Sequence, residues 1–153
     1  MAHSLNLTLK IGQDAATQKK LEEFIQLFPA VQGQIAAAMA ESEILHFARI
    51  VLIGKEYIQV LTEYDGDRKA YTDFFREKLP KVFELVFGLA EGAPPWDQLQ
   101  DSDTFFNFSK GKDIKPLGTS LSNDPEDHFV FSAYGDRTVK EIKAALSKAG
   151  ATQ

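Results

Sequence analysis

The sequence predicts an α+β fold contained in one domain, residues 1–153, and three observations predict it. Residues 45–64 alternate between apolar and polar side chains around Gly54-Lys55-Glu56, which indicates a β-hairpin. Apolar residues at helical spacing flank this hairpin on both sides, and strand-like segments lie near both ends of the chain. The resulting order, β-α-β-β-α-β-α, is that of a ferredoxin-like βαββαβ sandwich with an extra C-terminal helix.

The first two elements follow from simple periodicities. Apolar side chains at every second position of residues 4–11 predict a half-buried strand, and Asp14 is a suitable N-cap for the helix that follows. In that helix the apolar stripe runs through residues 21–39 and includes Pro29. Because proline removes a hydrogen bond from a helix interior, we expect a kink or two helices that meet near Phe28.

The hairpin loop fixes which side chains share a face of the sheet. A three-residue loop places one set on the helix-covered face: Ala48, Ile50, Leu52, Ile58, Val60 and Thr62. The opposite face then carries Phe47, Arg49, Val51, Tyr57, Gln59, Leu61 and Glu63. We prefer this register because it keeps Arg49 away from the covered face, where an unpaired charge would be costly. A two-residue loop would turn one strand over relative to the other.

A second long helix is expected from Asp67 onward, and Pro80 interrupts it. Residues 92–127 follow as a long irregular insertion before the last strand. Its aromatic side chains indicate that it packs against the rest of the protein, and a short helix is expected at 103–109.

The last strand is predicted at residues 128–134 and the last helix after it. Phe129, Phe131 and Ala133 would lie on one face of that strand, and His128, Val130, Ser132 and Tyr134 on the other. Thr138 and Glu141 form a capping box for the helix. Its buried stripe is expected to consist of Val139, Ile142 and Leu146.

Composition excludes several classes of protein. The net charge of −5, without a long basic cluster, argues against nucleic-acid binding. The absence of cysteine excludes disulfides and thiolate chemistry, and no paired histidine spacing indicates a metal site. No apolar run is long enough to span a membrane, and the start of the chain has no signal-peptide pattern. We therefore expect a soluble, cytoplasmic protein.

The face of the sheet that the helices leave open is the candidate site. Six ligand-binding residues are predicted: His46, Arg49, Tyr57, Gln59, Glu63 and Tyr134. Two such faces packed together would form a homodimeric barrel that holds a small ligand, with Arg49 as an anchor for an anionic group. The alternative is a face that is only solvated or covered by a second subunit. His46 is a haem ligand or base on the first interpretation and a structural residue on the second.

Three segments resemble a group of uncharacterised bacterial proteins. HFARIVLI at 46–53, TEYDGD at 62–67 and RKAYTDFF at 68–75 follow in the order in which those proteins place HFAR, DGD or DGS, and an aromatic helix. The resemblance covers about a fifth of the chain and implies the dimeric α+β-barrel superfamily. Members of that superfamily include haem-binding peroxidase-type proteins, small monooxygenases and non-catalytic binding modules, so the resemblance implies a fold with a pocket.

Two functional hypotheses follow. The first is a dimeric protein that binds a small, mostly apolar ligand between the sheet, the kinked helices and the 92–127 insertion, of redox or oxygenase type, with haem as a candidate cofactor. The second is a non-catalytic interaction module whose open sheet face and insertion aromatics bury a partner. The residues alone leave open whether the protein is an enzyme.

Overall fold

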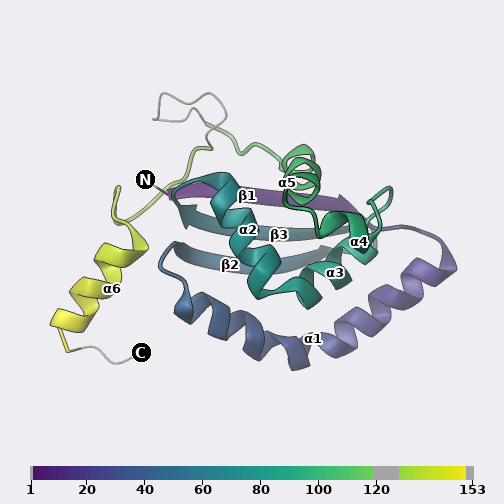
Figure 1. Cartoon of the computed structure of the whole chain (residues 1–153), viewed down its shortest axis with the longest axis horizontal. Coiled ribbons are helices and arrows are strands. Elements are labelled where there is room, and N and C mark those ends of the chain that lie inside the picture. Colours follow the sequence, from purple (N-terminus) through teal and green to yellow (C-terminus); the bar gives the residue numbers. More distant parts are fainter. Residues whose placement is uncertain (1, 119–127, 151–153) are drawn as a thin grey trace.

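The computed structural model describes residues 2–118 and 128–150 (Figure 1). Its elements are β1 (Ala2–Lys10), α1 (Ala15–Glu41), β2 (Leu45–Ile53), β3 (Tyr57–Asp65), α2 (Arg68–Lys78), α3 (Pro80–Gly88), α4 (Trp96–Leu99), α5 (Ser102–Gly111) and α6 (Val139–Lys148). The three strands form an antiparallel sheet in the order β1-β3-β2. The predicted α+β class is confirmed. None of the helices in the described ranges is both long and apolar enough to cross a bilayer.

The hairpin has the predicted register. Ala48 lies opposite Thr62, and Ile50 lies opposite Val60. Gly54 has a φ of 56°, which a glycine adopts without strain, and so begins the turn into β3. Arg49 is therefore on the face away from the helices, as expected, and β1 adds its buried leucines to the covered face: Leu5, Leu7 and Leu9.

The prediction of a strand at 128–134 is wrong, because these residues are irregular and then form a turn. The outer edge of β1, where such a strand would pair, is occupied by residues 112–114. The amide of Thr8 donates to the carbonyl of Lys112 at 2.9 Å, and the amide of Ile114 donates to the carbonyl of Asn6 at 3.0 Å. The described residues thus lack the fourth strand that a ferredoxin-like sheet requires, and Tyr134 does not lie on the sheet.

The long first helix is continuous through Pro29 and bowed, so the expected alternative of two separate helices is wrong (Figure 1). Asp14 caps it, accepting a hydrogen bond from the Thr17 amide at 3.0 Å. Its buried residues, Leu21, Phe24 and Ala38, lie on either side of its middle. The middle of α1 therefore packs less closely than its ends.

The second helix divides at the predicted proline, because α2 ends before Leu79 and α3 begins with Pro80 in its first turn. Beyond it, the segment expected to be irregular contains α4 and α5, and α5 includes the short helix predicted at 103–109. Phe105 of α5 is 2% exposed, and its ring lies 5.2 Å from that of Phe87 in α3. Phe105 therefore packs into the core, and Trp96 and Phe108 are partly buried against it, as expected for aromatic residues of the insertion.

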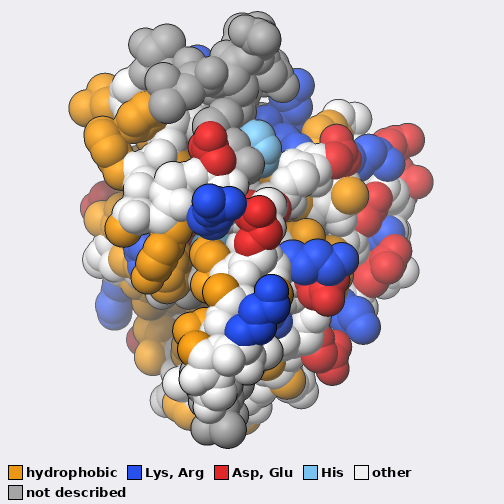
Figure 2. Space-filling model, turned by 90° about the vertical axis from the view of Figure 1, so that its left-hand side faces the viewer, with side chains coloured by type: hydrophobic (Ala, Val, Ile, Leu, Met, Phe, Trp, Pro, Cys, Tyr) orange, Lys and Arg blue, Asp and Glu red, His pale blue; other side chains and the backbone are white. Residues whose placement is uncertain are grey.

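The last helix, α6, lies at one end of the molecule (Figure 1). The amide of Val139 donates to Asp65 Oδ2 at 2.7 Å, and Lys143 Nζ donates to the carbonyl of Ser42 at 2.8 Å. The predicted capping box is present. The buried stripe expected here is wrong in part, because Val139 is buried whereas Leu146 is 45% exposed. Seen from this end, apolar side chains lie among acidic and basic ones (Figure 2).

Candidate functional site: an apolar cavity under the sheet

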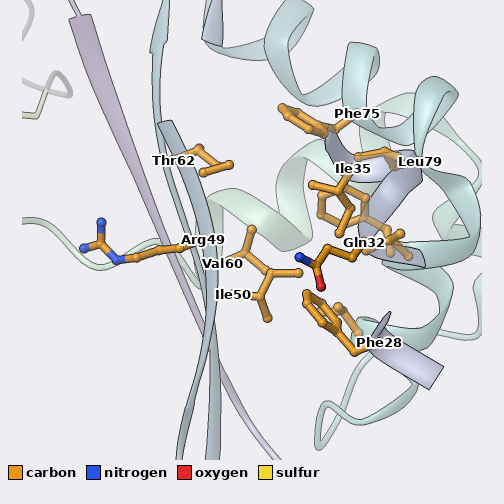
Figure 3. Close-up of a pocket in the computed structure, with 13 residues that line it drawn as sticks. Phe28, Gln32, Ile35, Arg49, Ile50, Val60, Thr62, Phe75 and Leu79 are labelled. Carbon is orange, nitrogen blue, oxygen red and sulfur yellow. The ribbon is translucent and has the colours of Figure 1, made fainter. Parts of the chain in front are cut away.

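A cavity of about 330 Å³ lies between the covered face of the sheet and the helices (Figure 3). Helix α1 contributes one wall, strands β2 and β3 the opposite wall, and α2 and α3 the end. The lining residues are Phe28, Gln32, Ile35, Ala48, Arg49, Ile50, Val60, Thr62, Phe75, Leu79, Val82, Phe83 and Val86. Most of these side chains are aliphatic or aromatic, so the cavity favours an apolar occupant.

The bow of α1 and the position of β2 together create this space. Strand β2 is at the edge of the sheet, and its Ile50 is only half-buried even though it points toward the helices. Ala48, next to it on the same face, has a small side chain and is exposed. Phe28 and Ile35, which face them from α1, are also half-buried. A straight helix packed along β2 would close this gap, and the bowed α1 leaves it open (Figure 1).

Polar groups are few in the cavity. Gln32 points from α1 toward Ile50 and Val60 (Figure 3). The Thr62 hydroxyl is hydrogen-bonded to the Tyr71 hydroxyl, and both residues are buried. Burial also raises the pKa of Tyr71 far above its ordinary value, so this phenol stays protonated. The side chain of Arg49 points to the opposite face of the sheet (Figure 3). None of the lining residues that the structure describes therefore directs a charged side chain into the space.

Haem does not fit this cavity. Haem iron takes histidine, cysteine, methionine or tyrosine as an axial ligand, and the lining residues include none of these. His46, the expected ligand, is not among the lining residues, and its Nε2 lies 2.8 Å from Asp65 Oδ1. The described part of the chain also has no group of three or more histidine, aspartate or glutamate residues placed to bind a metal ion.

Four of the six predicted site residues share the open face of the sheet. The strand register puts Arg49, Tyr57, Gln59 and Glu63 there. Gln59 Nε2 donates to Thr8 Oγ1 at 3.1 Å, which ties β3 to β1. Glu63 is half-buried, and within the described ranges its Oε2 has no hydrogen-bond partner. The predicted residues thus gather on the face opposite the cavity.

The other two predicted residues meet at the α6 end of the molecule. His46 is the extra residue of a bulge at the start of β2, and Tyr134 is 62% exposed in the turn before α6. Both line a shallow groove of about 370 Å³ between the end of α1, β2 and α6. The carboxylate of Asp65 contacts His46 through one oxygen and accepts a hydrogen bond from the Val139 amide through the other. Asp65 therefore positions the start of α6 against β2 and β3.

A serine, a histidine and an aspartate also meet at the edge of β1. Ser4 Oγ lies 3.3 Å from His128 Nδ1, and His128 Nε2 lies 3.7 Å from Asp113 Oδ2. Asp113 is ion-paired with Arg68 and accepts a hydrogen bond from the Asn6 amide at 2.7 Å. Ser4 is only 7% exposed, so its hydroxyl is poorly placed to attack a substrate. The network instead attaches residues 113 and 128 to β1.

Sequence reasoning missed Gln32, although a signal was present. Residue 32 is four positions after Phe28 and three before Ile35, so it falls on the apolar stripe of α1. The side chain of Gln32 is exposed in the structure, so it lies where the apolar stripe of α1 meets solvent at the mouth of the cavity. The 92–127 insertion was also expected to border the ligand. The described lining residues instead all precede residue 92.

The chain matches no family model, no curated protein and no solved structure. The resemblance of residues 46–75 to dimeric α+β-barrel proteins therefore stays a prediction.

Proposed function

We propose that this protein binds a small, predominantly apolar molecule in the cavity between α1, α3 and the sheet. The observation that carries the proposal is the cavity itself, about 330 Å³ of space with mostly apolar walls. Protein interiors are otherwise close-packed, with few voids larger than a water molecule. The space is open to solvent on the side of Gln32 and Ala48, which are both exposed, so a ligand can enter it from that side.

The proposal is for binding without catalysis. The described residues that line the cavity include no carboxylate and no imidazole, so none is an evident general acid or base. The Thr62 hydroxyl, the one hydroxyl in the lining, is already hydrogen-bonded to Tyr71. The walls of the cavity supply apolar contact area. This area favours the transfer of an apolar ligand from water into the cavity.

A fluorescent probe tests this proposal. N-phenyl-1-naphthylamine is uncharged, has two ring systems and gains fluorescence in apolar surroundings. We expect saturable binding to the wild-type protein and a loss of at least about tenfold in affinity for Ile35→Trp, because the larger side chain fills the cavity. Ile25→Trp is the matched control: it lies on the same helix, is 49% exposed and is not a lining residue. Equal affinities for the two variants would overturn the proposal.

The open sheet face supports a second candidate function, association with a second copy of the chain. Phe47 is 64% exposed, Ile53 is 50% exposed and Tyr57 is 36% exposed, and all three lie on this face. Exposed apolar groups gathered on one face are typical of a protein interface. The resemblance to dimeric α+β barrels supports the same partner.

Sedimentation velocity tests this second candidate. We expect the wild-type protein to sediment as a dimer and Phe47→Asp to sediment as a monomer, since a charge would then be buried in the contact. Leu117→Asp is the control, because Leu117 is 94% exposed and lies outside the strands. A monomeric wild-type protein at all concentrations would contradict the candidate without affecting the cavity proposal.

A further inference from the structure

We infer that an extended peptide segment of a partner protein binds in the groove between β2 and α1 as a fourth strand of the sheet, with one of its apolar side chains in the cavity. The inference rests on the proposed function, because the cavity must accept an apolar group, and it names the class of partner that supplies this group. Three features carry it: the uncovered edge of β2, the wall that α1 forms beside this edge, and the position of the cavity between them.

The two edges of the sheet differ. Residues 112–114 form backbone hydrogen bonds with the outer edge of β1. No segment of the described chain forms such bonds with the outer edge of β2 between residues 47 and 52. This stretch has no proline and one charged residue, Arg49, so little in it discourages pairing. Its alternate N–H and C=O groups are therefore a template for another extended chain.

Helix α1 limits what can pair with this edge. It runs along the side of β2 that faces away from β3 (Figure 1), and Phe28 and Ile35 of α1 line the cavity together with Ile50 of β2. A second sheet that continued past β2 would meet this helix, whereas a single added strand needs about 4.8 Å beside β2. Residues 24–40 of α1 include no charged residue. The groove therefore suits a single extended segment and offers it a mostly apolar wall.

The cavity determines how the side chains of this segment are placed. Ala48 and Ile50 belong to the covered face of β2, and both line the cavity. A strand added beside β2 continues the pleat, so every second side chain of the segment points to the same face. Ala48 is small and exposed, so a leucine-sized side chain can enter next to it. Main-chain hydrogen bonds then supply affinity, and the cavity selects the apolar side chain.

Synthetic peptides test the inference by displacement of bound N-phenyl-1-naphthylamine. The parent peptide has seven residues, in which threonine alternates with valine, leucine and valine, and both of its ends are blocked. Two further peptides carry N-methyl groups, one on the amides of the three apolar residues and the other on the amides of the last three threonines. Only one of these two sets of amides can face β2 while the leucine points into the cavity. We therefore expect one methylated peptide to bind at least about tenfold more weakly than the parent and the other to bind like it.

Amide hydrogen exchange measured by NMR identifies the strand that is paired. The parent peptide should slow exchange of alternate backbone amides within residues 47–52 at least about tenfold, because these amides gain hydrogen-bond partners, whereas naphthalene should leave their rates unchanged. The Thr8 amide is the internal control, because it already donates to the Lys112 carbonyl at the covered edge.

Three results would overturn the inference while leaving the proposed function intact: equal displacement by both methylated peptides, unchanged exchange within residues 47–52, or a parent peptide that fails to displace a probe bound to the wild-type protein. Absence of probe binding would instead remove the proposed function, and the inference with it.

Discussion

At the scale of single residues, the pair formed by Thr62 and Tyr71 shows how a polar contact survives beside an apolar cavity. Thr62 is 2% exposed and Tyr71 is 1% exposed, so neither hydroxyl can rely on water. Each satisfies the other, and the Tyr71 ring stacks on Tyr64 with 4.0 Å between the ring centroids. The pair therefore joins α2 to β3 next to the lining.

Stability should depend on Tyr71 at alkaline pH. The folded protein keeps the phenol proton where the unfolded chain loses it, near the ordinary tyrosine pKa of 10.0. Its contribution is fully present below that pH and is lost as the pH rises above it. Tyr71→Phe should cost about 1–3 kcal/mol of unfolding free energy at about pH 8, because Thr62 loses its partner.

Urea unfolding of the wild type and Tyr71→Phe at about pH 8 and about pH 11 checks this prediction. The difference between the two proteins should shrink at the higher pH. Tyr57→Phe controls for the general effect of removing a phenol, because Tyr57 is on the open face. A difference that is the same at both pH values would show that Tyr71 titrates normally.

At the scale of elements, the bend in α1 connects the sequence to the site. Pro29 lies one position after Phe28 and three before Gln32, so this proline falls where the helix borders the cavity. An interior proline costs a helix about 3 kcal/mol relative to alanine. Pro29 therefore lowers the stability of α1, the helix that forms the curved wall of the cavity.

Replacing Pro29 by alanine should therefore raise the thermal midpoint and weaken binding of N-phenyl-1-naphthylamine, since a straighter α1 can pack closer to β2. Pro80→Ala is the control, because proline in the first helical turn gives up no internal hydrogen bond. Calorimetry and fluorescence titration measure the two effects. A Pro29→Ala protein that is more stable but binds the probe as tightly as the wild type would show that the bend in α1 is not needed for the cavity.

The elements also show what a sequence pattern can predict. The hairpin was predictable down to its register because alternation, a three-residue loop and the position of Arg49 all agree. The strand predicted at 128–134 failed although Phe129, Val130 and Phe131 favour β structure. A local sequence pattern does not show which segment of the chain pairs with the edge of a sheet. Here residues 112–114 form hydrogen bonds with β1 in place of residues 128–134.

At the scale of the whole molecule, one sheet has two different faces. The open face carries four of the residues predicted for the site, and the covered face borders the cavity. The sequence indicated an apolar ligand and kinked helices, but the location of the space depends on how far α1 stands from β2. That distance is a tertiary property, so residue patterns could only suggest it through Pro29 and Gln32.

The central claim is that an apolar ligand enters the covered face, and isoleucine methyl NMR tests it most directly. Titration of naphthalene into the protein with ¹³C-labelled isoleucine δ-methyl groups reports on both faces at once. The account predicts that the signals of Ile35 and Ile50 shift on binding while those of Ile25 and Ile53 stay in place, because only the first two line the cavity. Shifts confined to Ile53 on the open face, or no shift at any isoleucine, would contradict it.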